Sequence, residues 1–183
     1  MTIVFIGGSR RLGKLAAPVK ERIDKIINNG FTILIGDANG TDRCVQDYLA
    51  SKHYRNVIVF CMEGVCRNNI GDWDTKGIEA SGTGKDFNYY STKDLQMAKE
   101  ASYGFMIWDA KSNGTLNNII NLLKRDKKIL VYFSPDKAFH KLRGFQDLSG
   151  LLAKCDRKEL ERFEKKFGIS RLLNSEQPEL TFA

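Results

Sequence analysis

Three glycine-rich turns hold the residues of this sequence that are best suited to bind a phosphate group. Each turn follows a short apolar run and precedes a segment with helical periodicity. A helix that begins there points free backbone N–H groups and its positive dipole end into the turn, and glycine lets a ligand approach the backbone closely. The alternative is that short strand-to-helix loops need glycine and capping residues for geometry alone. The turns span residues 7–10, 36–42 and 112–115.

The elements that must position these turns alternate between apolar runs and amphipathic segments. We expect five buried strands, at residues 3–6, 31–35, 56–61, 104–108 and 129–133, and four helices, at residues 15–29, 42–52, 92–102 and 115–125. Alternation with short links predicts an α/β fold, a Rossmann-like doubly wound parallel sheet of about five strands. The turns then meet at the edge where such sheets bind ligands.

Residues 62–92 interrupt this alternation. The stretch contains five glycines and shows no sustained period, which is typical of a functional or mobile loop. Its aromatic residues either stack on a base or cover the core, and the sequence does not choose between the two. Thr92 is expected to cap the next helix. The aromatic residues are Trp73, Phe87, Tyr89 and Tyr90.

The chain becomes more polar and helical after Pro135. We therefore divide it into a nucleotide-binding domain, residues 1–134, and a helical C-terminal extension, residues 135–183. Asp156 is placed to cap a helix whose apolar stripe includes Phe163. That stripe packs either on the core or on a partner subunit. Residues from 174 onward are expected to form a loose tail.

The net charge of +7 raises the local concentration of anions around the protein. The charge is spread evenly, with net values of +2, +3 and +2 for residues 1–92, 93–134 and 135–183. Such a spread is more typical of a solvated surface than of a nucleic-acid groove, so single-stranded nucleic acid is the less favoured partner.

Membrane association, metal binding and disulfide formation are not expected. No apolar run approaches the ~20 residues that cross a bilayer, and the first apolar run is too short for a signal peptide, so we predict a cytoplasmic protein. The four cysteines and two histidines show no metal-ligand spacing, and free thiols are expected. No cofactor is predicted.

The order of the three turns resembles the SLOG superfamily, which includes the lonely guy (LOG) phosphoribohydrolases, the DNA-processing protein DprA and YspA-type proteins. Gly8-Ser9-Arg10 matches the G-S-R turn after the first strand, residues 36–42 look like the YspA-type G-D-A-x-G-x-D motif, and residues 112–115 are similar to the LOG phosphate loop. The resemblance covers residues 3–133. It implies a Rossmann-like fold and a nucleotide-derived ligand, and family members often form homodimers.

The resemblance also shows where LOG-type catalysis would lack a residue. The catalytic glutamate of the LOG loop corresponds to Asn118, whose side-chain amide cannot act as a general acid or base. The upstream R-K-x-x-M motif begins here with Lys93-Asp94. Asp94 is therefore the first choice for a catalytic carboxylate. The carboxyl group of Asp42 has a competing role as a helix N-cap, which we favour for it.

Three functions remain for these residues. The leading one is binding of a phosphate-bearing nucleotide or nucleotide-derived ligand. The alternatives are a LOG-like N-glycosidase acting on nucleoside 5′-monophosphates and a DprA-like single-stranded DNA binder. The candidate ligand-binding residues are Gly8, Ser9, Arg10, Gly36, Asp37, Gly40, Lys93, Asp109, Ser112, Gly114 and Thr115, and the candidate catalytic residue is Asp94.

Overall fold

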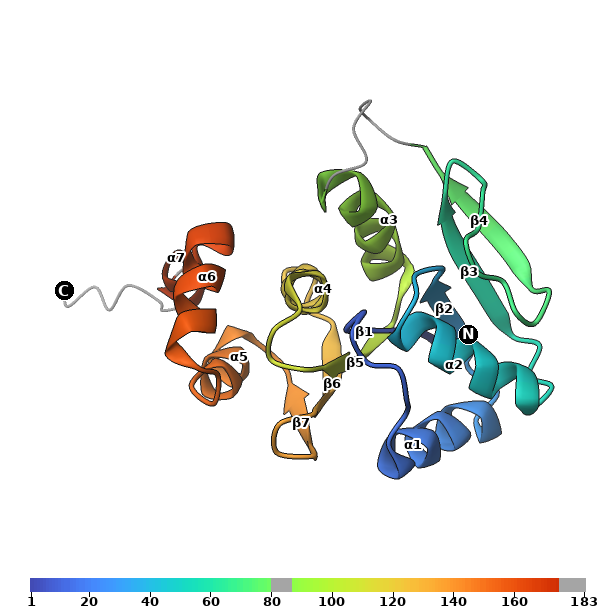
Figure 1. The fold of residues 1–183 in the computed structure, drawn as a ribbon, viewed down its shortest axis with the longest axis horizontal. Helices are drawn as coiled ribbons and strands as arrows, with labels where there is room; N and C mark the ends of the chain where they lie inside the picture. The colour runs from blue at the N-terminus through green and yellow to red at the C-terminus, as the bar shows by residue number, and fades with distance from the viewer. Residues whose placement is uncertain (80–86, 175–183) are drawn as a thin grey trace.

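The protein folds around one seven-stranded sheet, described here from a computed structural model that covers residues 1–79 and 87–174. The strand order is β4-β3-β2-β1-β5-β6-β7, and all neighbours are parallel except β6 and β7 (Figure 1). The expected doubly wound α/β fold is confirmed. The strands are β1 (Ile3–Gly8), β2 (Thr32–Gly36), β3 (Val57–Met62), β4 (Asp74–Ile78), β5 (Tyr103–Trp108), β6 (Lys128–Phe133) and β7 (Ala138–Leu142).

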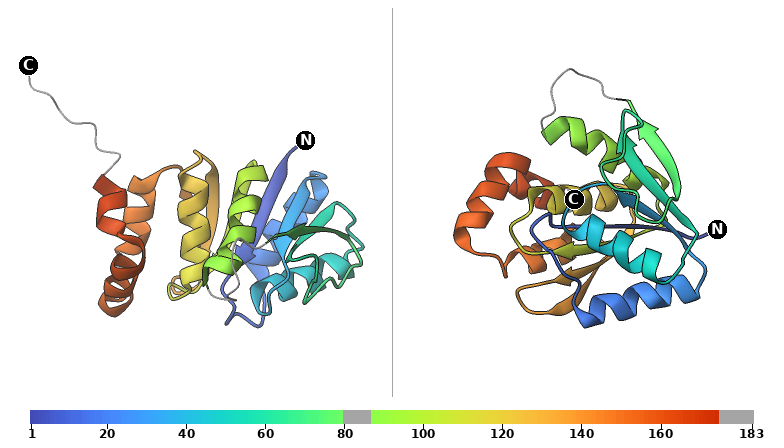
Figure 2. Two further views of the ribbon diagram at one scale, coloured as in Figure 1. Left: turned by 90° about the horizontal axis from the view of Figure 1, so that it is seen from above. Right: turned by 45° about the vertical axis from the view of Figure 1, so that its right-hand side comes forward.

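Helices cover both faces of the sheet. The helices α1 and α2 pack on one face and α3 and α4 on the other, while α5, α6 and α7 stand together beyond α4 at one end (Figure 2). None of the helices in the described residues is long and apolar enough to cross a bilayer. The helices are α1 (Ala17–Asn28), α2 (Thr41–Ser51), α3 (Phe87–Glu100), α4 (Asn113–Leu123), α5 (Phe145–Leu152), α6 (Arg157–Phe167) and α7 (Ile169–Asn174).

The side chains of successive residues in each central strand point to opposite faces of the sheet. In β1, Val4 and Ile6 join the core beneath α1 and α2, whereas Phe5 joins the core beneath α3 and α4. Because both faces are covered, the strands are apolar throughout. This is why continuous apolar runs predicted them correctly.

The two strands at the edges of the sheet were not predicted. β4 lies in the stretch expected to be irregular, and β7 lies in the segment expected to be helical. Residues 74–77 of β4 are exposed, so β4 has none of the apolar signal of a buried strand. The helix expected from Thr92 begins earlier, at Phe87, so the prediction that Thr92 caps it is wrong.

Two of the four cysteines are bonded to each other. Cys61, in β3, forms a disulfide with Cys66, while Cys44 and Cys155 are free. The prediction of four free thiols is therefore wrong for this pair. The bridge joins the end of a buried strand to the loop that follows it.

The helix α6 packs against the end of the sheet. Asp156 occupies the predicted N-cap position of α6, and Gly168 ends the helix in the left-handed conformation with φ = 60°. Between them, Phe163 is fully buried, with its ring centroid 5.8 Å from that of Trp108 at the end of β5. The apolar stripe therefore packs on the core of the same chain.

The topology brings the three glycine turns together. The chain runs outward from β1 to β4 and then returns to place β5 on the other side of β1. The strand order reverses between β1 and β5, and this switch point is where open α/β sheets form a crevice at the carboxyl ends of their strands. The first turn follows β1, the second follows β2 and the third follows β5.

Candidate functional site

A cleft of about 490 Å³ lies at the switch point. It is bordered by residues of all three glycine turns, by α3 and by one side of α6. Its volume lies within the range of small-molecule sites. Seven predicted site residues line it, namely Gly8, Arg10, Lys93, Asp94, Asp109, Ser112 and Gly114.

Ser9 joins the three turns to one another. Its side chain is fully buried, and its hydroxyl donates to Oδ1 of Asp109 at 2.8 Å. Its carbonyl oxygen accepts from the hydroxyl of Thr41 at 2.9 Å, and its backbone N–H donates to the carbonyl oxygen of Ile107 at 3.0 Å. Ser9 was predicted to bind ligand, but the structure places it beneath the cleft, where it fixes the geometry of the turns.

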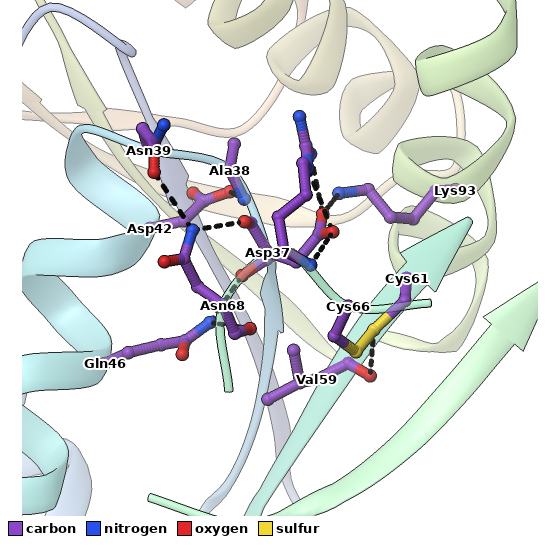
Figure 3. A network of polar contacts seen from close by, with 12 residues as sticks. Asp37, Ala38, Asn39, Asp42, Gln46, Val59, Cys61, Cys66, Asn68 and Lys93 are labelled. Atoms are coloured by element: carbon purple, nitrogen blue, oxygen red, sulfur yellow. Dashed lines mark hydrogen bonds and ion pairs between the residues drawn. A yellow bond between two sulfur atoms is a disulfide. The ribbon is translucent and has the colours of Figure 1, made fainter. Parts of the chain in front are cut away.

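Asp37 is likewise a buried anchor and does not line the cleft. Its carboxylate accepts two hydrogen bonds from the Arg67 guanidinium, at 2.7 and 3.0 Å, and lies 2.8 Å from the Lys93 ammonium (Figure 3). Burial opposes ionisation of Asp37, but Arg67 and Lys93 outweigh it and hold its pKa well below the usual range. The aspartate therefore positions two cations, one of which, Lys93, reaches the cleft.

Two further carboxyl groups, those of Asp42 and Asp94, line the cleft near Lys93. Burial raises the pKa of Asp42 to about 7, although the nearby Lys93 charge opposes this. Burial also raises the pKa of Asp94, against the charges of Lys93 and Arg10. At neutral pH the carboxyl group of Asp42 is therefore partly protonated and can donate a hydrogen bond.

The preferred role of Asp42 as a helix N-cap is wrong. The N-cap of α2 is Gly40, and Asp42 lies in the first turn of that helix. Its Oδ2 atom accepts from the backbone N–H of Ala38 at 3.3 Å. The glycine is required at the cap because its φ is +83° and a Cβ there would overlap the backbone of Arg10.

Asn118 positions Asp94. With its amide oriented to satisfy its neighbours, the Asn118 nitrogen donates to Oδ2 of Asp94 and to the carbonyl oxygen of Gly114, both at 3.2 Å. Asn118 thus holds the carboxyl group of Asp94 in the cleft.

The third turn presents the N-terminus of α4 to the cleft. Ser112 is the N-cap and accepts from the backbone N–H of Thr115 at 3.3 Å. Oδ1 of Asp109 accepts from the backbone N–H groups of Lys111 and Ser112, at 3.0 and 2.8 Å. Asp109 therefore shapes the turn, and Thr115 is buried below it.

The four predicted site glycines divide into three packing positions and one open position. A Cβ at Gly8 would lie 2.5 Å from the carbonyl oxygen of Ile107, and one at Gly36 would lie 2.5 Å from Oδ2 of Asp42. A Cβ at Gly114 would meet only Oγ of Ser112, at 3.9 Å. Gly114 is therefore the predicted glycine whose missing side chain leaves room for a ligand.

The aromatic residues of the 62–92 stretch serve different purposes. Trp73 is buried, and its indole N–H donates to the carbonyl oxygen of Tyr54 at 2.7 Å, so it covers the core. Tyr90 lines the cleft, with the guanidinium carbons of Arg10 and Arg67 at 5.2 and 4.9 Å from its ring centroid. Tyr89 is buried. Phe87 was also predicted either to stack on a base or to cover the core, but its side chain lies outside the described part of the structure.

Five predicted residues lie outside the cleft lining, namely Ser9, Gly36, Asp37, Gly40 and Thr115. Sequence reasoning missed two cations of α6, Arg162 and Lys166, which line the cleft. Their spacing of four residues places them on one helix face. Nothing in the sequence indicated that this face lies beside the third turn.

Within residues 1–79 and 87–174, no group of three or more histidine, cysteine or acidic side chains is arranged to hold a metal ion. The cleft is thus built of cations, carboxyl groups and helix N–H groups. Together, the strand order and the cleft at its reversal define the chain as a Rossmann-like α/β protein.

Comparison with solved structures agrees with this class. The chain is similar to DNA processing protein A from Helicobacter pylori, whose structure is described as giving insights into a single-stranded DNA binding mode. The TM-score is 0.56 at 16% sequence identity, over 95% of this chain and 79% of that one. At this identity the likeness concerns the fold. No family model and no curated protein matches the sequence.

Proposed function

We propose that the cleft binds a phosphate-bearing nucleotide. Its phosphate contacts the N-terminus of α4, and its sugar faces Asp42 and Asp94. The observation that carries this proposal is that Gly114, open to a ligand, lines the same cleft as several exposed cations, Lys111 and Arg162 among them. Backbone N–H groups at a helix N-terminus favour an anion, and nearby cations add to that preference.

The carboxyl groups support the orientation of the ligand. Asp42 and Asp94 lie near Lys93, and Lys111, Arg162 and Lys166 line the same cleft. A dianionic phosphate is favoured beside the cations and disfavoured beside ionised carboxyl groups. Carboxyl groups bind sugar hydroxyls as acceptors or donors, according to their protonation.

Titration calorimetry with nucleoside 5′-monophosphates tests this proposal. We expect binding to the wild-type protein and loss of binding in Gly114→Val, because the branched side chain occupies the space that the phosphate needs. Equal affinity in the wild type and in Gly114→Val would contradict the role of the third turn. Circular dichroism checks that the variant is folded.

Single-stranded DNA binding is the second candidate, and the likeness to DNA processing protein A favours it. The net charge of +7 would assist contact with a phosphodiester backbone. An oligothymidylate titrated at several salt concentrations separates the two candidates. DNA binding predicts an affinity that falls steeply with salt, whereas a single mononucleotide in the cleft gives a shallow dependence.

N-glycosidase activity remains a prediction for Asp94, as does assembly into a homodimer. The position of Asp94 in the cleft, and its hydrogen bond from Asn118, support testing the first. Proton NMR of the protein with nucleoside monophosphates would detect release of free base. Turnover that is lost in Asp94→Asn while ligand binding persists would support catalysis, and the absence of turnover in both forms would support a binding protein.

A further inference from the structure

Two cations of α6 border the third-turn side of the cleft. Arg162 and Lys166 lie four residues apart, on the same side of the helix, and both contribute to the cleft lining. The residue between them that faces the core, Phe163, is fully buried against Trp108. Because this buried contact fixes α6, the two cations are held at the cleft by the fold itself.

A direct contact also links α6 to the third turn. The Arg162 guanidinium donates to the carbonyl oxygen of Lys111, and it pairs with Oε2 of Glu159 at 2.5 Å. Lys111 itself lines the cleft. This contact holds Arg162 of α6 next to Lys111, beside the third turn.

Three cations, Lys111, Arg162 and Lys166, border this side of the cleft, and Arg162 pairs with Glu159. Asp109, which precedes the third turn, accepts hydrogen bonds from the backbone N–H groups of Lys111 and Ser112 and from the hydroxyl of Ser9. The N-terminus of α4 adds further positive potential.

The pKa of Lys166 also favours an anion at this side of the cleft. It is lowered mainly by desolvation and, to a smaller extent, by the charge of Arg162. Two neighbouring cations repel each other, and an anion between them removes that penalty.

On these grounds we infer that the α6 side of the cleft is a subsite for a further phosphate, so that the preferred ligand is a nucleoside 5′-diphosphate or triphosphate. This inference rests on the proposed nucleotide binding. The α4 N-terminus takes one phosphate, while Lys166 and Arg162 take the next.

Titration calorimetry with inorganic pyrophosphate and orthophosphate, and with ADP and AMP, tests the subsite. We expect pyrophosphate and ADP to bind more tightly than orthophosphate and AMP. Lys166→Gln should lower the affinity for pyrophosphate and ADP about tenfold, the usual effect of one charged hydrogen bond, and that for orthophosphate and AMP much less.

Lys165→Gln is the matched control, since it removes the same charge from the adjacent residue, which faces away from the cleft. It should change all four affinities less than about threefold, through long-range electrostatics alone. Equal effects of the two substitutions, or equal affinity of the wild type for AMP and ADP, would overturn the subsite.

The same experiment separates this inference from the proposed function. If AMP binds and Gly114→Val abolishes that binding, but Lys166→Gln and Lys165→Gln behave alike, only the subsite is wrong. If none of the four probes binds the folded wild-type protein, both the nucleotide site and the subsite are wrong.

Discussion

The ammonium nitrogen of Lys93 lies 2.8 Å from Oδ1 of Asp37, and the two side chains are only 3% and 2% exposed. A buried charge is tolerated when it is paired and becomes costly when its partner is removed. This pair links the loop after β2 to α3, so it fixes the position of α3, whose residues form one wall of the cleft.

Asp37→Asn should destabilise the fold by about 3–5 kcal/mol, because it leaves Lys93 buried without its counter-charge. Urea denaturation measures the change in the free energy of unfolding. Asp24→Asn is the control, because the ion pair of Asp24 with Lys52 is exposed and should contribute less than about 1 kcal/mol. A similar small effect in both variants would contradict the structural importance of Asp37.

The same pair predicts a loss of stability in acid. The pKa of Asp37 is lower in the folded protein than in the unfolded chain, so its contribution is complete above the unfolded value of about 4. It declines as the pH falls below that value, toward the folded pKa. The decline with pH should be smaller in Asp37→Asn, measured by urea denaturation between pH 2 and pH 6.

The raised pKa of Asp42 predicts the opposite dependence of stability on pH. Its folded pKa is about 7, above the unfolded value of about 4, so the unfolded chain loses this proton first. The contribution of Asp42 to stability is therefore complete below pH 4 and is lost as the pH rises toward 7. The carboxyl group faces the charges of Lys93, Asp94 and Asp37, which together with burial set this value.

Ionisation of Asp42 should also weaken anion binding, because it places a negative charge in the cleft. We expect pyrophosphate affinity to fall between pH 6 and pH 8 in the wild type and to fall less in Asp42→Asn. Asp47→Asn, an exposed position on the same helix, is the control and should follow the wild type. An unchanged pH profile in Asp42→Asn would contradict the assignment.

Gly114→Ala should separate stability from binding. Its methyl group meets no atom closer than 3.9 Å, and alanine favours a helix over glycine by about 0.5–1 kcal/mol, so the variant should be at least as stable as the wild type. Its nucleotide affinity should nevertheless fall. Gly150→Ala, in α5, is the control, since a Cβ there meets nothing within 4 Å and the residue lies outside the cleft. It should gain stability and retain affinity.

Reduction of the Cys61–Cys66 disulfide should lower stability by up to about 2 kcal/mol, the loop-closure contribution for so short a loop. Arg67, the next residue, holds Asp37 through two side-chain hydrogen bonds, so a looser loop also weakens that contact. Thermal melts with and without reductant measure the effect. In the double variant Cys61→Ser, Cys66→Ser the reductant should have no effect, and an unchanged wild-type melting temperature would contradict the prediction.

The sequence by itself determined the central strands, the helices between them and the three turns. Runs such as residues 3–6 are apolar throughout because both faces of the sheet are covered, and this signal is local. The edge strands β4 and β7 have partly exposed side chains and therefore gave no such signal. Gly114 was identified from its position at the start of a helix, which is also a local property.

Only the tertiary structure decided which of the turn residues line the cleft. Ser9 and Asp37 have the chemistry of binding residues, but their partners are 100 and 56 positions away in the chain, and these contacts bury them. Arg162 and Lys166 reach the cleft because Phe163 packs on Trp108, a contact between elements far apart in sequence. Such contacts depend on how the elements are packed, and local residue patterns do not encode them.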